Sequence, residues 1–247
     1  MLTRKDCQKA LKKWQSSKKN LNEVLRLFPS NNVFVITRED IQWIKKNNQA
    51  DYFHIFVGVH ERKAVLIYSP IDASGADVKL QEYPFSYLTE LDRELRFVEK
   101  EVTTLTKIAI LSKDLKVISK INKEKLPLPS HDIECQDLIL KEIEDWRNNA
   151  ADWFFKQVSE SKGEGIFNMF TVPIEDIGAG ECDVIALFAF KYSKVYNQFL
   201  PTIIFVQDET ELFENSNFLS VQSNVFNWSQ PCPPFCRDKD KLTIQED

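Results

Sequence analysis

The most unusual pair of reactive residues in this 247-residue sequence lies near its carboxyl end. Cys232 and Cys236 are four positions apart, with Pro233 and Pro234 between them. If the prolines bend the chain enough, the two thiols could form a disulfide or hold a soft metal ion together. Because this spacing is less specific than Cys-x-x-Cys, we favour an extended tail whose thiols stay reduced. Cys232 and Cys236 are the one candidate site, a thiol pair, that the sequence offers.

The positions of the histidines and glycines argue against a zinc site and a phosphate-binding loop. His54, His60 and His131 are the only histidines, and none has a second ligand at the close spacing of a zinc site. The six glycines form neither of the standard phosphate-binding loops. We therefore expect no catalytic residue, no bound metal and no cofactor.

Two acidic patterns resemble known sites but favour a structural role. Asp51, Glu61 and Lys63 have the order of a metal-dependent nuclease set, yet a straight strand between the two acids would separate them by about 30 Å. Asp72 and Asp77 flank a fragment similar to a calcium loop, but the later bidentate glutamate is missing. We interpret the first as a charged hairpin and the second as a plain turn.

Hydrophobic spacing predicts alternating helices and strands. One helix is expected over residues 4–28, broken near residue 16, and a second over residues 132–158. Another is expected to start near Tyr87, while residues 106–121 fit a helix or a strand. Two short helices are also expected, one that begins after Thr37 and carries residues 41–44 and one over residues 173–177. Short apolar runs predict strands in both halves of the chain. The expected strands are residues 33–36, 52–59, 64–68, 166–170, 183–190 and 202–206.

The two halves of the sequence share one pattern. Phe34, Ile36 and the Glu-Asp-Ile of residues 39–41 match Phe170, Val172 and residues 175–177 without a gap. We interpret this match as an internal duplication. The prolines of residues 126–130 then mark a linker. The predicted fold is α+β, with two related lobes, 1–128 and 129–247, each a mainly antiparallel sheet packed with helices and with a groove between them.

Charge and apolar content exclude several classes of protein. The net charge of −5 argues against a general attraction to nucleic acid or anionic lipid. The longest apolar run, residues 184–190, is far shorter than a membrane-spanning helix, and no secretory leader is evident. An odd number of scattered cysteines fits a reducing compartment. We expect a cytoplasmic protein without nucleic-acid or membrane partners.

The order of these segments resembles that of one protein family. A tryptophan-bearing helix, a strand, an Asp-Ile helix, a hairpin followed by residues 72–77 and the tail from Cys232 to Cys236 are similar to a family of uncharacterised bacterial proteins. The second half has no equivalent of Gly75. The resemblance implies no activity and no catalytic residue.

The sequence favours a non-enzymatic binding or protein-interaction module whose partner is another protein or a second copy of the chain. Eighteen phenylalanines and five tryptophans are expected to supply the core and a partner surface. Two alternatives remain open. One is an enzyme of unrecognised type that uses the carboxylates of Asp40 and Asp176, for which helix capping is the simpler role. The other is an antitoxin or immunity-type protein with an acidic face, suggested by residues 208–211.

Overall fold

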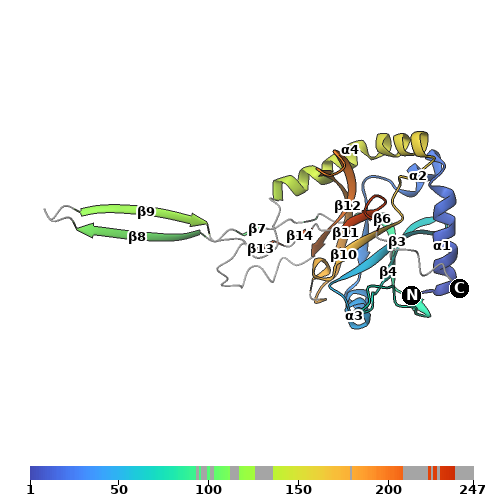
Figure 1. The fold of residues 1–247 in the computed structure, drawn as a ribbon, viewed down its shortest axis with the longest axis horizontal. Helices are drawn as coiled ribbons and strands as arrows, with labels where there is room; N and C mark the ends of the chain where they lie inside the picture. Colours follow the sequence, from blue (N-terminus) through green and yellow to red (C-terminus); the bar gives the residue numbers. More distant parts are fainter. Residues whose placement is uncertain are drawn as a thin grey trace.

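The computed structural model describes residues 1–92, 95, 99–100, 103–111, 117–125, 136–178, 180–207, 222–223, 225–226 and 229–236. These residues form an α+β fold with one nine-stranded antiparallel sheet and four α-helices, as Figure 1 shows. The helices are α1 (Arg4–Ser17), α2 (Leu21–Leu27), α3 (Arg38–Asn47) and α4 (Gln136–Ser161), with a short 3-10 helix, η1 (Ile174–Ile177). No described helix is long and apolar enough to cross a membrane.

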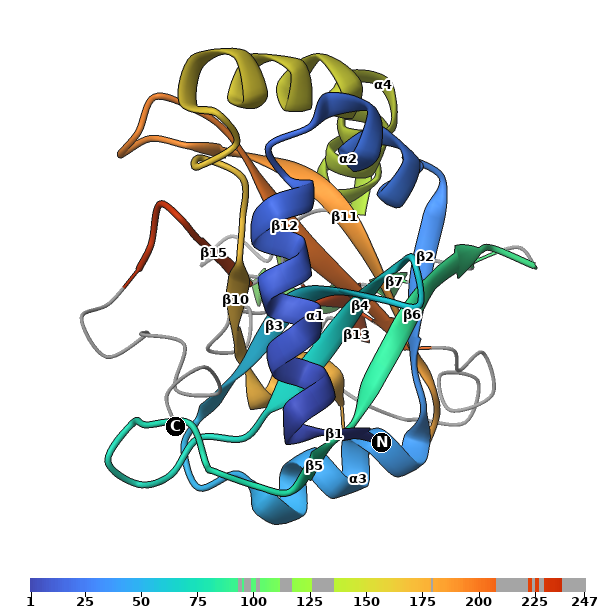
Figure 2. The ribbon, with the colours of Figure 1, turned by 90° about the vertical axis from the view of Figure 1, so that its right-hand side faces the viewer.

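The large sheet is built from strands of both halves of the sequence. Its order is β14-β12-β11-β2-β6-β4-β3-β10-β15. The strands are β2 (Asn32–Ile36), β3 (Tyr52–His60), β4 (Lys63–Ser69), β6 (Phe85–Glu90), β10 (Met169–Pro173), β11 (Val184–Ser193), β12 (Gln198–Gln207), β14 (Val225–Phe226) and β15 (Gln230–Cys232). The two end strands, β14 and β15, belong to one short stretch of chain, so the sheet curls until its two edges meet (Figure 2).

Smaller sheets complete the described structure. β1 (Leu2–Thr3) pairs with β5 (Glu82–Tyr83), and β7 (Glu99–Lys100) pairs with β13 (Gln222–Ser223). β8 (Thr103–Leu111) and β9 (Val117–Lys125) form a two-stranded hairpin that projects from the body of the molecule in Figure 1.

Helix α1 lies across β3, and α4 lies across β11. Thr3 caps α1 by accepting a hydrogen bond from the backbone of Asp6. The expected helix of residues 4–28 is interrupted because Asn20 caps a separate helix, α2, through the backbone of Glu23. The break that the sequence predicts near residue 16 is therefore present.

One hydrophobic core joins the two halves. It contains Trp14 and Phe28 of the first half and Phe154, Phe167 and Phe188 of the second, all almost fully buried. The indole of Trp14 stacks on Phe167 and donates a 2.9 Å hydrogen bond to the Phe167 carbonyl. Smaller clusters fill the space under α1 and the space under α4.

Four expectations on the fold meet different outcomes. The α+β class is confirmed, but separate lobes over 1–128 and 129–247 are not, because β2 pairs with β11 and β3 pairs with β10. The predicted linker and boundary near residue 128 lie outside the described residues. The helix expected from Tyr87 is wrong: residues 85–90 form strand β6, because they complete the sheet between β2 and β4.

Candidate functional site

The two edges of the large sheet meet at Ser229. This residue lies between β14, which pairs with β12, and β15, which pairs with β10. The Ser229 hydroxyl accepts a hydrogen bond from the Ile203 amide (2.6 Å) and donates one to the Ile203 carbonyl (3.0 Å). Thr202 Oγ1 donates to the Ser229 carbonyl (3.0 Å). A serine side chain therefore takes the place of a backbone pair at this junction, which we call the seam.

Beyond Ser229 the seam opens, because each of the two facing segments contains a proline there. If the register of β12 and β14 continued, Pro201 would face Gln230 and Pro231 would face Leu200. Neither proline has an amide hydrogen to donate to a sheet ladder. β15 instead pairs with β10, so β12 and β15 are not paired with each other past Ser229.

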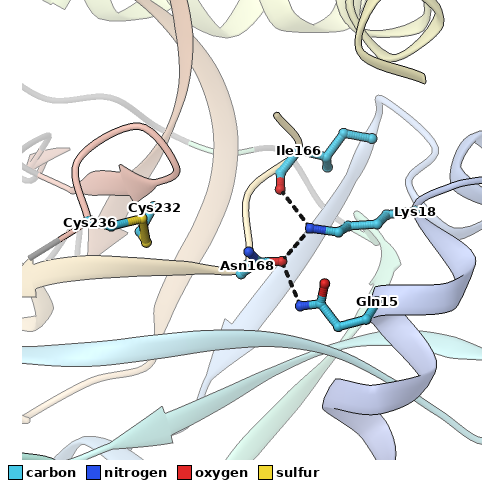
Figure 3. The surroundings of a disulfide bond; sticks show 6 residues. All are labelled: Gln15, Lys18, Ile166, Asn168, Cys232 and Cys236. Atoms are coloured by element: carbon cyan, nitrogen blue, oxygen red, sulfur yellow. Dashed lines mark hydrogen bonds between the residues drawn. A yellow bond between two sulfur atoms is a disulfide. The ribbon is translucent and has the colours of Figure 1, made fainter. Parts of the chain in front are cut away.

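A disulfide holds the turn that follows β15. Cys232 and Cys236 are bonded to each other, and the Phe235 amide donates to the Pro231 carbonyl (2.9 Å). Figure 3 shows the disulfide, and the Cys232 carbonyl accepts a 2.7 Å hydrogen bond from the amide of Asn168. The favoured interpretation of this thiol pair, an extended and reduced tail, is therefore not what the structure has. The alternative, a disulfide, is present.

A pocket of about 220 Å³ fills the opening of the seam. Its lining comes from the ends of β11 and β12, from β15 and from the disulfide-closed turn. The lining residues are Lys191, Tyr192, Ser193, Leu200, Pro201, Thr202, Ser229, Gln230, Pro231 and Phe235. All belong to the second half of the chain, so this pocket is not the groove between two lobes that the duplication predicts.

Exposed apolar side chains continue from this pocket. Tyr192, Val195, Tyr196 and Phe199 lie on the β11–β12 hairpin, and their exposed fractions range from 42% for Tyr196 to 82% for Val195. The ring of Tyr196 contacts Phe235, at 5.2 Å between centroids, and the ring of Tyr192 contacts Phe199 at 5.3 Å. We call these four residues and Phe235 the rim.

A buried lysine lies on the other side of Asn168 from the disulfide (Figure 3). Lys18 is 3% exposed, and its Nζ donates to Asn168 Oδ1 (2.8 Å) and to the Ile166 carbonyl (3.5 Å). Gln15 Nε2 donates to the same oxygen of Asn168 (2.8 Å). Burial, which disfavours the charged ammonium, lowers the pKa of Lys18 to about 8. This cluster joins the end of α1 to the segment before β10.

The histidines have structural surroundings where they are described. His54 Nδ1 lies 3.0 Å from Asp77 Oδ1, and Ser69 is its cross-strand partner. A serine, a histidine and an aspartate are the residue types of a hydrolase triad, but all three are buried and none lines the pocket. His60 contacts the hydroxyl of Tyr87. His131 lies outside the described residues.

The acidic candidates also have local roles. Asp72 Oδ1 accepts hydrogen bonds from the Ser74 amide (2.8 Å) and hydroxyl (2.7 Å), and the Ser74 hydroxyl lowers the pKa of Asp72. The predicted plain turn is therefore confirmed. Asp51 and Glu61 lie at opposite ends of β3, as expected.

The carboxylates of the enzyme alternative lie in two short helices. Asp40 is in the first turn of α3, where its amide donates to the hydroxyl of Thr37, the N-cap residue (3.2 Å), and its carboxylate accepts from the same hydroxyl (2.8 Å). Asp176 is buried in η1. Residues 208–211, the basis of the antitoxin alternative, lie outside the described residues. Among the residues that are described, no three His, Cys, Asp or Glu side chains gather as a metal site would require.

The seam pocket was missed by sequence reasoning, although two signals for it are present. Apolar residues at 192, 195, 196 and 199 surround a hairpin turn, where polar residues are usual. Pro201 and Pro231 mark strands that cannot pair fully. No protein-family model, no curated protein and no solved structure matches this chain. The resemblance to an uncharacterised bacterial family therefore stays a prediction, and the seam geometry is the basis for any statement on function.

Proposed function

We propose that this chain is a binding protein, and that it takes an apolar side chain of an extended partner polypeptide into the seam pocket. The observation that supports this most is the continuity of the pocket with the exposed rim. Contiguous exposed aromatic residues beside a pocket are typical of protein-interaction sites, where a few buried anchors supply most of the binding energy.

The size of the pocket favours a peptide anchor over a whole small molecule. At about 220 Å³ it is smaller than the roughly 300–1,000 Å³ of most ligand pockets. One edge of β12 also lies beside the pocket, because β12 and β15 are not paired with each other past Ser229. An extended segment can pair with such an edge while one side chain enters the pocket.

A peptide selection tests this function. The full chain is used to select binders from a random peptide library displayed on phage, and the selected peptides are measured by fluorescence polarisation. We expect peptides that share one aliphatic or aromatic anchor. Phe235→Ala should weaken their binding by about 30-fold, the effect of removing one central contact of about 2 kcal/mol.

Phe155→Ala is the matched control, because Phe155 is 59% exposed but lies on α4 and does not line the pocket. This variant should bind the selected peptides as the unchanged chain does. A selection without a common anchor contradicts the proposal. Equal losses from the Phe235 and Phe155 substitutions contradict it as well.

We also infer that the sheet arose by internal duplication. The two halves of the large sheet have matching strands: β2 corresponds to β10, β3 to β11, β4 to β12, and β6 to the β14–β15 segment. Each pair of neighbouring strands in the sheet has a counterpart under this correspondence, for example β3 with β4 and β11 with β12. The correspondence also relates α1 on β3 to α4 on β11. Superposition of residues 32–69 on residues 169–207 tests this inference, and strands that fail to overlay in order and direction would overturn it.

The duplication allows the seam to be compared with its counterpart in the first half of the chain. In the first half, the counterpart of the seam is the contact of β4 with β6, where residues 65–67 pair with residues 85–87. The second half lacks this pairing beyond Ser229. The opening is therefore not required by the fold, as expected for a position that has specialised for binding.

A further inference from the structure

We propose that the β8–β9 hairpin binds the surface of an anionic lipid bilayer. This inference is independent of the seam pocket. It rests on the local charge of the hairpin, on its residue types and on its place in the fold.

The hairpin is a separate sheet in the described part of the chain. β8 pairs with β9 over nine residue pairs, from Thr103 opposite Lys125 to Leu111 opposite Val117. Neither strand belongs to the large sheet, and the hairpin extends away from the body (Figure 1). An isolated two-stranded hairpin is only marginally stable in water. A surface that binds the hairpin would therefore stabilise it.

The charge of the hairpin is opposite to that of the rest of the chain. Residues 103–125 contain six lysines and two acidic residues, a net charge of +4, so the other residues carry −9 of the total of −5. Nine residues of strand span about 30 Å. The Debye length at physiological salt is about 8 Å, so the far end of such a hairpin is screened from an acidic body. The whole-chain charge, which argues against anionic lipid, hides this local reversal.

Residue types favour a membrane over other polyanions or proteins. Residues 103–125 contain no arginine and no aromatic side chain. Nucleic-acid sites use both to contact bases, and protein interfaces are enriched in both and depleted in lysine. Lysines combined with aliphatic residues are typical of segments that lie in the headgroup region of anionic membranes.

The order of residues along the hairpin fits that location. The last two residue pairs before the connection of residues 112–116 are aliphatic, with Ile110 paired with Ile118 and Leu111 paired with Val117. The connection itself, Ser-Lys-Asp-Leu-Lys, adds two lysines and one aspartate. Lys120, Lys123 and Lys125 follow on β9 toward the body. Lysines therefore lie on both sides of these aliphatic pairs in the sequence, so the aliphatic residues can lie at the boundary with the acyl chains while the lysines contact anionic headgroups.

Vesicle flotation of the full chain tests the proposal. The vesicles contain phosphatidylcholine alone or with phosphatidylserine, at physiological salt and at about 1 M salt, where charge attraction is screened. We expect binding only to the vesicles with phosphatidylserine, and weaker binding at high salt. The charge variant replaces four lysines of the paired strands and should bind about tenfold more weakly or worse. Its substitutions are K107Q, K120Q, K123Q and K125Q.

A matched control changes the same number of lysines on the body. Its exposed positions lie in α1, beside α1 and in α3, and its substitutions are K5Q, K12Q, K19Q and K46Q. This control should bind as the unchanged chain does. A second hairpin variant, I110S with I118S, keeps the charge and should also bind more weakly. Unchanged tryptophan fluorescence will show that the body of each variant is folded, because the described tryptophans lie there.

Three outcomes would overturn the proposal. One is no binding to the vesicles that contain phosphatidylserine. Another is an equal loss of binding in the body-lysine control. The third is binding of the full chain to an RNA oligonucleotide, or its self-association in sedimentation velocity, in the absence of vesicle binding.

Discussion

At the scale of single residues, Lys18 predicts an unusual dependence of stability on pH. Its pKa is lowered from 10.5 to about 8 in the folded chain because the side chain is buried. Between these two values the unfolded chain binds more protons than the folded chain, so the contribution of Lys18 to the free energy of unfolding rises with pH. The full rise is about 3 kcal/mol. Urea unfolding of the unchanged chain and of Lys18→Met, from pH 7 to pH 10, measures most of this rise.

Lys18→Met should lose this rise, so the stability of the unchanged chain relative to the variant should increase above pH 8. Lys12→Met is the control, because Lys12 is exposed on the same helix, α1, and is not among the charges that shift the pKa of Lys18. Its curve should run parallel to that of the unchanged chain. A constant difference between the unchanged chain and Lys18→Met across the range would show that the ammonium keeps its ordinary pKa.

Residue types alone could not have revealed the Lys18 cluster. Its members, Gln15, Lys18, Ile166 and Asn168, come from segments about 150 residues apart, and a lysine at the end of a helix is usually solvated. The turn at Asp72 was predictable because its hydrogen bonds are local. The disulfide required a tight turn after β15, and the sequence could offer that only as one alternative.

At the scale of elements, the contact of α1 with β3 depends on Gly58. A Cβ at this position would lie 3.0 Å from the Ala10 Cβ and 3.3 Å from the Ala10 backbone carbon. Gly58→Ala should therefore lower the free energy of unfolding by about 1–3 kcal/mol, because the helix must move outward. Chemical denaturation monitored by circular dichroism measures this loss.

The second substitution Ala10→Gly separates crowding from other effects. It removes the nearest atom but costs about 1 kcal/mol within a helix. If the crowding is real, the double variant should lose clearly less stability than the sum of the two single losses. Additive losses would show that α1 does not press on Gly58.

Elements were predictable where one periodicity dominates. Helix α3 and the β3–β4 hairpin have strong local patterns and end at caps or turns. The sequence wrongly predicts a helix from Tyr87, because Leu88, Leu91 and Leu95 follow a helical spacing. The actual partners of residues 85–90 are β2 and β4, which precede them in the chain, and local spacing carries no information about those partners.

At the scale of the whole molecule, the order of strands could not be derived from the order of segments. The repeated pattern led to an expectation of two lobes, each pairing its own strands. Instead, strands of one half pair with strands of the other: β2 pairs with β11, and β3 pairs with β10. Pairing between distant segments depends on tertiary packing, which a repeat in the sequence does not specify.

This pairing between strands of the two halves predicts that the halves unfold together. Phe170 is fully buried in the shared core, between Phe167 and Phe188. Phe170→Leu leaves a cavity and should lower the free energy of unfolding by about 1–2 kcal/mol. Hydrogen exchange by mass spectrometry should show the same loss for the slowest amides of β3 and of β11, although these strands come from different halves. Phe155→Leu, at an exposed position, should change the opening free energy of the amides of β3 or of β11 by no more than about 0.5 kcal/mol. A loss confined to β11 would instead indicate two lobes that open independently, and would make the shared sheet a weak contact between them.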